Sequence, residues 1–321
     1  MSNTTASLAR RITWASSKQS YLTAQLLADQ DLVDDCLRAY AYFRWADDRI
    51  DLEFKDSAES FAFILRQKTL IEQLYRGQRP GDLCPEEAML ADLIAHDRKP
   101  ESGLRSFIRN FMTVIEFDAI RRGRLASRSE LAEYTSNLAT AVMDGIQYFI
   151  GNGESYPKTS DRNLAVTGAH ITHMLRDVRE DLPVGIINVP AEALCDQDIR
   201  PLDLDSERFR AWVREQVELA RTCFREGKAY IDSLDVLRCK LAGVFYCARF
   251  ECILDAIERD GYRLRADYPE RHCLKVWLGM LRLALLVIGK HLAERLRSPW
   301  LRPGPQAALA SGMNIPSYHT K

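Results

Sequence analysis

Apolar residues recur at helical spacing along almost the whole chain, and this pattern restricts the fold more than any other feature of the sequence. Val33, Leu37, Tyr40 and Phe43, for example, are three or four positions apart, which places them on one face of a helix. Similar stripes occupy residues 61–74, 104–120, 131–150, 164–178, 209–234, 239–258 and 274–296. No Asn-Gly pair joins two alternating runs of the kind that predicts a β-hairpin. We therefore expect an all-α protein of about ten helices.

The composition agrees with a helical globular protein. The 321 residues include only 16 Gly and 12 Pro, whereas a protein of many strands needs frequent turn residues. No repeat of fixed period and no long low-complexity linker divides the chain. We predict one helical domain over residues 1–298, followed by a C-terminal tail over residues 299–321.

Charge and cysteine content exclude several classes of protein. The 44 Lys and Arg residues balance 45 Asp and Glu residues, which argues against a general nucleic-acid-binding protein. The eight cysteines form no CxxC pair, and the N-terminus lacks the apolar run of a signal peptide, so we expect a cytoplasmic protein. Three basic residues interrupt the apolar stretch 274–292, which therefore predicts a core helix rather than a membrane span. Peripheral membrane contact is the alternative, and the oligomeric state is left open.

Two short acidic segments depart from the ordinary amphipathic pattern. Asp47 and Asp51 are four residues apart, and Asp177 and Asp181 repeat this spacing 130 residues later. In a helix this spacing puts both carboxylates of a pair on one face, where they repel each other. Two such pairs that face each other would need cations to neutralise the repulsion between their carboxylates. Oxygen ligands suit Mg²⁺, which keeps some waters and takes further ligands from substrate phosphates.

An arginine beside each acidic pair adds a partner for phosphate. Arg44 lies close to the first pair and Arg176 to the second, and a guanidinium binds phosphate oxygens directly. Together these parts describe a site that holds a diphosphate and removes it as a leaving group. The alternative is two solvated helix faces, in which Arg44 pairs with Asp48 and Arg176 with Glu180.

The first acidic segment resembles a signature of the squalene/phytoene synthase family, the head-to-head prenyl diphosphate synthases. That signature reads approximately Tyr-x-x-x-Arg-x-x-Asp-Asp-x-x-Asp, and it is matched by Tyr40, Arg44, Asp47, Asp48 and Asp51. The second signature is matched by Arg176, Asp177, Glu180, Asp181, Gly185 and Pro190. Between the two, Glu116, Asp118 and Tyr134 fall where the family has an acidic pair and a pocket tyrosine. The resemblance extends from about residue 10 to residue 295.

The resemblance implies a single-domain class I isoprenoid synthase fold, with helices around a central cavity. It implies a Mg²⁺ site formed by Asp47, Asp48, Asp51, Asp177 and Asp181. The catalytic residues would be Asp47, Asp51, Asp177, Asp181 and Tyr134. The substrate-binding residues would be Ser17, Tyr40, Arg44, His173, Arg176 and Phe250. The implied substrates are prenyl diphosphates such as farnesyl or geranylgeranyl diphosphate, which ionise to an allylic carbocation before they are joined. The family uses NADPH to make squalene, but nothing in this sequence supports an NADPH site.

Several family positions are altered in this chain. His173 replaces the asparagine of the second signature, Met143 replaces a glycine and Phe250 replaces a tyrosine. Residues 185–190 read Gly-Ile-Ile-Asn-Val-Pro where the family has Gly-Arg-x-Tyr-x-Pro. The resemblance assigns these positions to the second substrate and the cyclopropyl intermediate, and Met143 is expected to narrow the cavity. A terpene cyclase or hydrolase that acts on one prenyl diphosphate is therefore the alternative, and a non-catalytic relative is a third hypothesis.

His170 and His173 form an HxxH motif close to Asp177. Two imidazoles and a carboxylate on one helix face can bind a transition metal such as zinc, although this spacing is common without a metal. His173 is alternatively a hydrogen-bond donor or proton acceptor in place of the missing asparagine. The remaining interpretation is that both are core histidines with satisfied hydrogen bonds.

Overall fold

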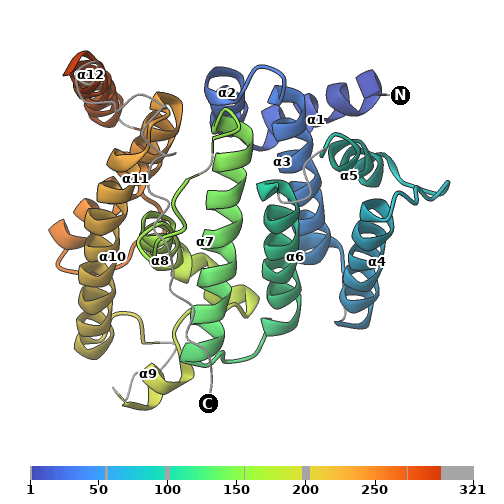
Figure 1. Ribbon diagram of the computed structural model, residues 1–321. Helices are drawn as coiled ribbons and strands as arrows, with labels where there is room; N and C mark the ends of the chain where they lie inside the picture. Colours follow the sequence, from blue (N-terminus) through green and yellow to red (C-terminus); the bar gives the residue numbers. More distant parts are fainter. Residues whose placement is uncertain are drawn as a thin grey trace, which may run out of the picture.

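The computed structural model describes residues 2–54, 57–97, 102–154, 156–196, 203–272 and 274–297. These residues form twelve α-helices and contain no strand (Figure 1), so the all-α prediction is confirmed. The predicted C-terminal tail, residues 299–321, lies outside the described residues.

The helices are numbered by their order along the chain. In chain order they are α1 (Ser2–Ser16), α2 (Lys18–Leu27), α3 (Val33–Asp48), α4 (Ser57–Tyr75), α5 (Pro85–Ala95), α6 (Gly103–Arg121), α7 (Arg128–Ile150), α8 (Leu164–Asp181), α9 (Ala191–Asp196), α10 (Glu207–Ser233), α11 (Leu237–Arg259) and α12 (Leu274–Arg297). A π-helical turn, η1 (Arg49–Glu53), follows α3, and two short 3₁₀ turns are η2 (Leu182–Val184) and η3 (Pro269–His272).

Local sequence signals define the ends of the central helix α7. Ser127 accepts a hydrogen bond from the backbone N–H of Glu130 at 3.2 Å, and the Glu130 carboxylate accepts one from the Ser127 backbone N–H at 2.8 Å. This reciprocal capping box satisfies two backbone donors at the helix start. After α7 the chain turns at Asn152 and Gly153, whose φ angles are 55° and 72°. The Asn-Gly pair therefore connects two helices, as expected.

The described residues form two large apolar cores and a smaller one. The first large core gathers side chains mainly from α3 to α7, including Tyr42 and Ile108, with a few from α8, α10 and α11. The second gathers side chains from α8 to α11, including Phe209 and Phe224, and the small core joins α1, α2, α3 and α5. The two large cores meet where α7 packs against α8, and Figure 1 shows α7 between the N-terminal helices and the pair α10 and α11.

Close packing of α8 on α10 fixes the helix that carries the second acidic pair. A Cβ atom at Gly227 of α10 would lie only 2.3 Å from the backbone nitrogen of Ala165 in α8. A side chain at this position would therefore force the two helices apart, because real Cβ contacts are much longer. Glycine here lets α8 lie directly against α10.

Helix α12 differs from its prediction as a core helix. It packs against α11 and η3, but six of its leucines are exposed: Leu278, Leu281, Leu285, Leu286, Leu292 and Leu296. None of the described helices is both long enough and apolar enough to cross a membrane.

Candidate active site

The first acidic pair lies at the C-terminal end of α3. Asp47 and Asp48 occupy the last turn of α3, whereas Asp51 belongs to the π-helical turn η1. The spacing predicts that both residues of the pair lie on one continuous α-helix. The structure differs from this prediction, because Asp51 lies in the π-helical turn after α3. The two carboxylates are nevertheless close enough for the charge of Asp51 to raise the pKa of Asp47. A π-helical turn is rare and is frequently found at functional sites.

Two arginines flank this pair. Arg44 Nε lies 3.1 Å from Asp48 Oδ2, and Arg44 Nη1 lies 3.5 Å from Asp47 Oδ2. Arg122, the residue after α6, approaches Asp51 Oδ1 to 3.3 Å. Burial, followed by the charges of Asp51 and of Asp118 on α6, still raises the pKa of Asp47 to about 7. The ion pair between Arg44 and Asp48, which the alternative of a solvated helix face predicts, is present. It does not compensate the negative charges of Asp51 and Asp118 that act on Asp47.

Asp118 brings α6 and α7 into the same site. Its carboxylate lies 2.8 Å from Nε of Arg121 in an ion pair, and it accepts a hydrogen bond from the Tyr134 hydroxyl at 3.1 Å. Burial raises the pKa of Asp118 to about 6, although Arg121 and Tyr134 act in the opposite direction. The Arg121 guanidinium lies 5.0 Å from the centre of the Tyr134 ring and 5.6 Å from that of Phe117, which is within cation–π range.

The second acidic pair lies in the last two turns of α8. Asp177 Oδ2 is 2.7 Å from Nε2 of His173, and Arg176 forms a bidentate pair with the same carboxylate. Burial opposes ionisation of Asp177, but these hydrogen bonds outweigh it and hold the pKa below its usual range. Burial and the nearby charge of Asp177 instead raise the pKa of Asp181 to about 6. The two members of the pair therefore have opposite pKa shifts.

A chain of contacts from Asp118 through Arg121 and Asn188 connects α6 to the second acidic pair. Arg121 Nη1 donates to Asn188 Oδ1 at 2.6 Å, and Asn188 Nδ2 donates to Asp181 Oδ2 at 2.8 Å. Burial raises the pKa values of Asp51, Asp118 and Asp181, and the charge of Arg121 opposes this shift in all three. One guanidinium thus lies within electrostatic reach of carboxylates from both signatures. The structure brings the two pairs to one site.

The backbone after α6 and the backbone after α8 are joined beside this contact chain. The Gly123 N–H donates to the Gly185 carbonyl at 2.8 Å, and Gly185 has a φ of 82°, a conformation that favours glycine. A Cβ atom at Gly185 would also lie 3.2 Å from the Gly123 nitrogen. Gly185 therefore allows the loop to bring Asn188 against Arg121.

The raised pKa values of Asp47, Asp118 and Asp181 predict that the site destabilises the fold as the pH rises. These carboxyls ionise near pH 4 in the unfolded chain but near pH 6 or 7 in the folded one. Between these values the folded state holds more protons, so the free energy of unfolding falls with rising pH. Arg44 and Arg121 offset only part of this effect.

When the pH is raised from about 5 to about 8 without Mg²⁺, we expect the free energy of unfolding to fall less in Asp47→Asn than in the wild type. Urea denaturation of both proteins at the two pH values measures this difference. Added Mg²⁺ should stabilise the wild type more at the higher pH. An identical pH dependence of the two proteins would contradict the raised pKa of Asp47.

The histidines of the HxxH motif are in different environments. The His173 side chain is 51% exposed and bonded to Asp177, whereas His170 is buried and its two ring nitrogens have no hydrogen-bond partner. Across the described residues, no three His, Cys, Asp or Glu side chains form a ready-made metal cage. This applies to the HxxH motif with Asp177, which gives the zinc hypothesis no support, and equally to the two aspartate pairs. His170 also does not match the expectation of a satisfied core histidine.

Of the remaining predicted site residues, two lie next to residues that contact the acidic pairs, and one caps a helix. Tyr40 lies one turn before Arg44 on α3 and is close enough to interact with its charge. The Phe250 ring lies 6.5 Å from that of His173. Ser17 caps α2, because its hydroxyl accepts a hydrogen bond from the Ser20 N–H at 3.1 Å; its role in substrate binding stays a prediction.

The sequence interpretation missed Arg121, Arg122 and Asn188. The two arginines follow Asp118 by three and four residues, a spacing that puts them next to it on a helix, so a local signal for them existed. Asn188 was noted only as the residue that replaces a family tyrosine. Its contact with Arg121, 67 residues away, has no local signal.

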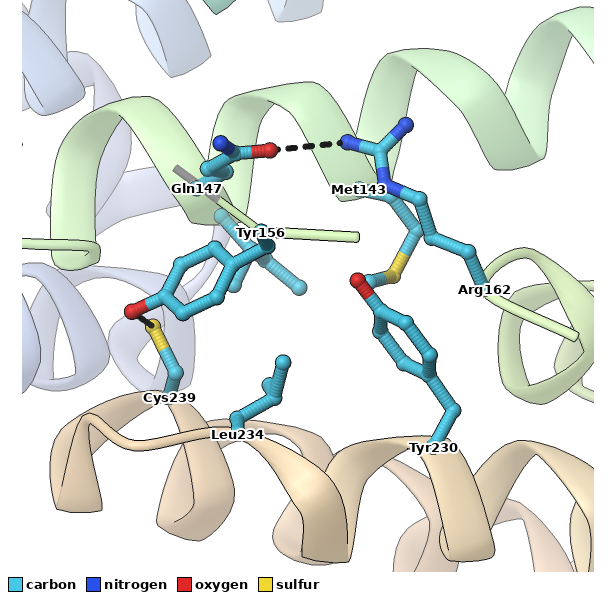
Figure 2. Close-up of a pocket in the computed structure, with 8 residues that line it drawn as sticks. Met143, Gln147, Tyr156, Arg162, Tyr230, Leu234 and Cys239 are labelled. Atoms are coloured by element: carbon cyan, nitrogen blue, oxygen red, sulfur yellow. Dashed lines mark hydrogen bonds between the residues drawn. The ribbon is translucent and has the colours of Figure 1, made fainter. Parts of the chain in front are cut away.

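A small apolar pocket lies between α7 and the helices α10 and α11 (Figure 2). Its lining consists of Met143, Ile146, Gln147, Tyr156, Arg162, Tyr230, Leu234 and Cys239. Figure 2 shows the Met143 side chain reaching the end of Tyr230. The centre of a water molecule has only about 10 Å³ of free space there, which is room for about one water. Met143 lines this pocket, and the narrowing of the substrate cavity that is expected of it stays a prediction.

Known proteins resemble the chain in sequence pattern and in fold. A sequence model of the squalene/phytoene synthase family matches residues 14–277, while a search of curated proteins finds no match. A squalene synthase, HpnC, from Alicyclobacillus acidocaldarius superimposes with a TM-score of 0.63 at 19% identity, over 81% of this chain and 95% of that chain. A dehydrosqualene synthase solved in complex with a ligand gives a TM-score of 0.66 at 16% identity, over 90% of this chain and 98% of that chain. The structural matches confirm the predicted fold.

Proposed function

Because the chain belongs to the squalene/phytoene synthase family, we propose that it joins two prenyl diphosphates head to head in a Mg²⁺-dependent reaction. The observation that carries the proposal is the contact chain from Asp118 through Arg121 and Asn188 to Asp181. It begins at Asp118, whose charge raises the pKa of Asp47 in the first signature, and it ends at Asp181 in the second, so a diphosphate can be held from two sides. A decayed, non-catalytic relative would have no reason to retain this arrangement.

The carboxylates suit Mg²⁺ by their chemistry. Asp47, Asp51, Asp177 and Asp181 would hold the ions, because hard oxygen ligands on two sides leave the remaining positions for water and phosphate. The raised pKa values of Asp47, Asp51 and Asp181 reflect burial and negative neighbours that a cation would compensate. When bound, Mg²⁺ would neutralise the charge that develops on the departing diphosphate.

The arginines and aromatic rings of the chain would perform the other tasks. Arg44 and Arg176 would orient the diphosphate by direct contacts with its oxygens. The faces of Phe117 and Tyr134, already stacked against the Arg121 cation, would stabilise the allylic carbocation in the same way. The apolar cores on both sides would exclude water from that cation. Farnesyl and geranylgeranyl diphosphate are the proposed substrates.

A cyclase or hydrolase that acts on one prenyl diphosphate is the second candidate. The missing Arg and Tyr in residues 185–190 favour it, because the resemblance assigns these positions to the second substrate. The two candidates share diphosphate ionisation and differ in the product.

The test is incubation of the protein with farnesyl or geranylgeranyl diphosphate and Mg²⁺, with and without NADPH, followed by product analysis. A C30 or C40 product is expected and would support head-to-head joining. A C15 or C20 hydrocarbon or alcohol would instead support the second candidate. If no diphosphate is released, both candidates are wrong.

We also propose a cytoplasmic location with peripheral contact to a lipid surface. The exposed leucines of α12 support this proposal, since a prenyl substrate and its product are both lipids. Sedimentation with lipid vesicles is the direct measurement. A protein that stays in the supernatant at all vesicle concentrations would refute the lipid contact.

A further inference from the structure

His170 is a buried histidine with two unpaired ring nitrogens. The residue is 6% exposed, and neither Nδ1 nor Nε2 has a hydrogen-bond partner within the described part of the chain. An unpaired buried polar group destabilises the fold, so each instance requires an explanation. His173, one turn further along α8, is different because its Nε2 is already bonded to Asp177.

His170 lies on α8 between Asp177, near the C-terminal end of the helix, and the N-terminal end, which is next to the apolar pocket. Its ring centre lies 5.1 Å from that of Tyr134, whose hydroxyl is bonded to Asp118. Seven residues, or about 10 Å along the helix axis, separate His170 from Asp177 on the same helix face. The same distance in the other direction leads to Asn163, next to Arg162 in the lining of the pocket in Figure 2.

Arg121, which is connected to Asp181 through Asn188, lies 5.0 Å from the centre of the Tyr134 ring. The first carbons of a prenyl diphosphate held at Asp177 and Asp181 would therefore lie toward Tyr134, and His170 packs against the same ring. The surroundings there are the aromatic rings of Tyr134 and, beyond it, Phe117. Among the described residues that contact Tyr134, His170 is then a base whose ring nitrogens have no hydrogen-bond partner.

We propose that His170 is the proton acceptor that ends the carbocation, so that the product forms by loss of a proton rather than by reduction. The inference rests on the proposed function, because it requires a prenyl carbocation in this site. It deepens that function by specifying the class of product, a hydrocarbon that carries one additional C=C bond and needs no NADPH.

The step balances without a further reactant. A C–H bond next to the cationic carbon breaks, and its electron pair becomes the π bond of the new alkene. The proton binds to the lone pair of a His170 ring nitrogen and makes an imidazolium. The imidazolium then returns the proton to the released diphosphate, which leaves in its protonated form and restores the neutral ring.

The surroundings of His170 favour this cycle. Burial, together with the charges of His173 and Arg121, lowers the pKa of the imidazole to about 3. The ring is therefore neutral at pH 7, with a lone pair free to accept a proton. A carbocation is a far stronger acid than imidazolium, so a weak base suffices. The same low pKa makes the imidazolium release its proton readily to the diphosphate.

The experiment compares His170→Phe and His170→Gln with the wild type, using farnesyl or geranylgeranyl diphosphate and Mg²⁺ without NADPH. Phe keeps an aromatic ring against Tyr134 but has no acceptor nitrogen, while Gln keeps polarity without comparable basicity. Diphosphate release and the ratio of hydrocarbon to alcohol are measured separately. His291→Gln is the matched control, because His291 is also 6% exposed but lies on α12.

Hydrocarbon formation should fall by about 10²-fold in both His170 variants, while diphosphate release is largely retained and water converts the cation to an alcohol. The control should keep the wild-type product ratio. An unchanged ratio in whichever His170 variant retains its fold, as judged by circular dichroism, would overturn the inference but not the proposed function. A wild type that makes hydrocarbon only with NADPH would also overturn it. Absence of diphosphate release from the wild type would instead refute the proposed function itself.

Discussion

Asp47→Asn is expected to lower kcat by about 10²–10³-fold without loss of stability. The side chain contributes a negative charge that Mg²⁺ would require, yet in the metal-free protein this charge is unfavourable. Burial and the charges of Asp51 and Asp118 raise its pKa to about 7, so neutral asparagine removes repulsion from the folded state. The side chain is 42% exposed, and solvent screening limits the gain to about 1 kcal/mol or less.

Asp34→Asn provides the matched control for this prediction. Asp34 lies in the first turn of the same helix and pairs with Arg10, away from the acidic pairs. The control should leave turnover unchanged. Turnover is measured as diphosphate release at saturating Mg²⁺, and stability as the urea midpoint. Retained activity in Asp47→Asn would remove Asp47 from the proposed metal ligands.

Arg121→Met is expected to affect both stability and activity strongly. The Arg121 side chain is only 8% exposed, and its removal leaves the buried Asp118 without its ion-pair partner. Loss of one partner from a buried pair typically costs about 3–5 kcal/mol. It also breaks the connection through Asn188 to Asp181, so we expect kcat to fall by about 10²-fold even where the variant is folded.

A second substitution separates the two effects of Arg121→Met. In the double variant with Asp118→Asn, the uncompensated charge is gone, so much of the lost stability should return while activity stays low. Arg124→Met is the control, because Arg124 forms an exposed pair with Glu130, and exposed ion pairs contribute little to stability. Recovery of full activity in the double variant would show that Arg121 serves the fold alone.

Local spacing explains why much of the fold and of the acidic site was predictable. The stripes that predicted α3, α4, α6, α7, α8, α10, α11 and α12 are properties of single helices. The aspartates were recognised in the same way, since each pair lies within five residues. The π-helical turn after Asp48 was not recognised, because it changes the hydrogen bonds of the backbone without a change in residue pattern.

The parts that were not predictable depend on contacts between distant segments. Asn188 joins the site only because Gly185 and Gly123 hold two loops together. Helix α5 was missed because it is buried on most of its surface, as Leu90 and Leu93 illustrate, and therefore lacks a clear amphipathic stripe. The exposure of the α12 leucines likewise depends on packing partners and not on the apolar character of the helix.

The site lies where the two large apolar cores meet, so a ligand bound there would also hold the two parts of the fold together. Asp51 and Asp118 extend from the half that contains the first core, and Asp181 extends from the half that contains the second. A diphosphate with its ions would therefore act as a clamp between the halves. A ligand stabilises only the state that binds it. Addition of diphosphate and Mg²⁺ should therefore slow amide hydrogen exchange on both sides of the junction between the two cores at the same time.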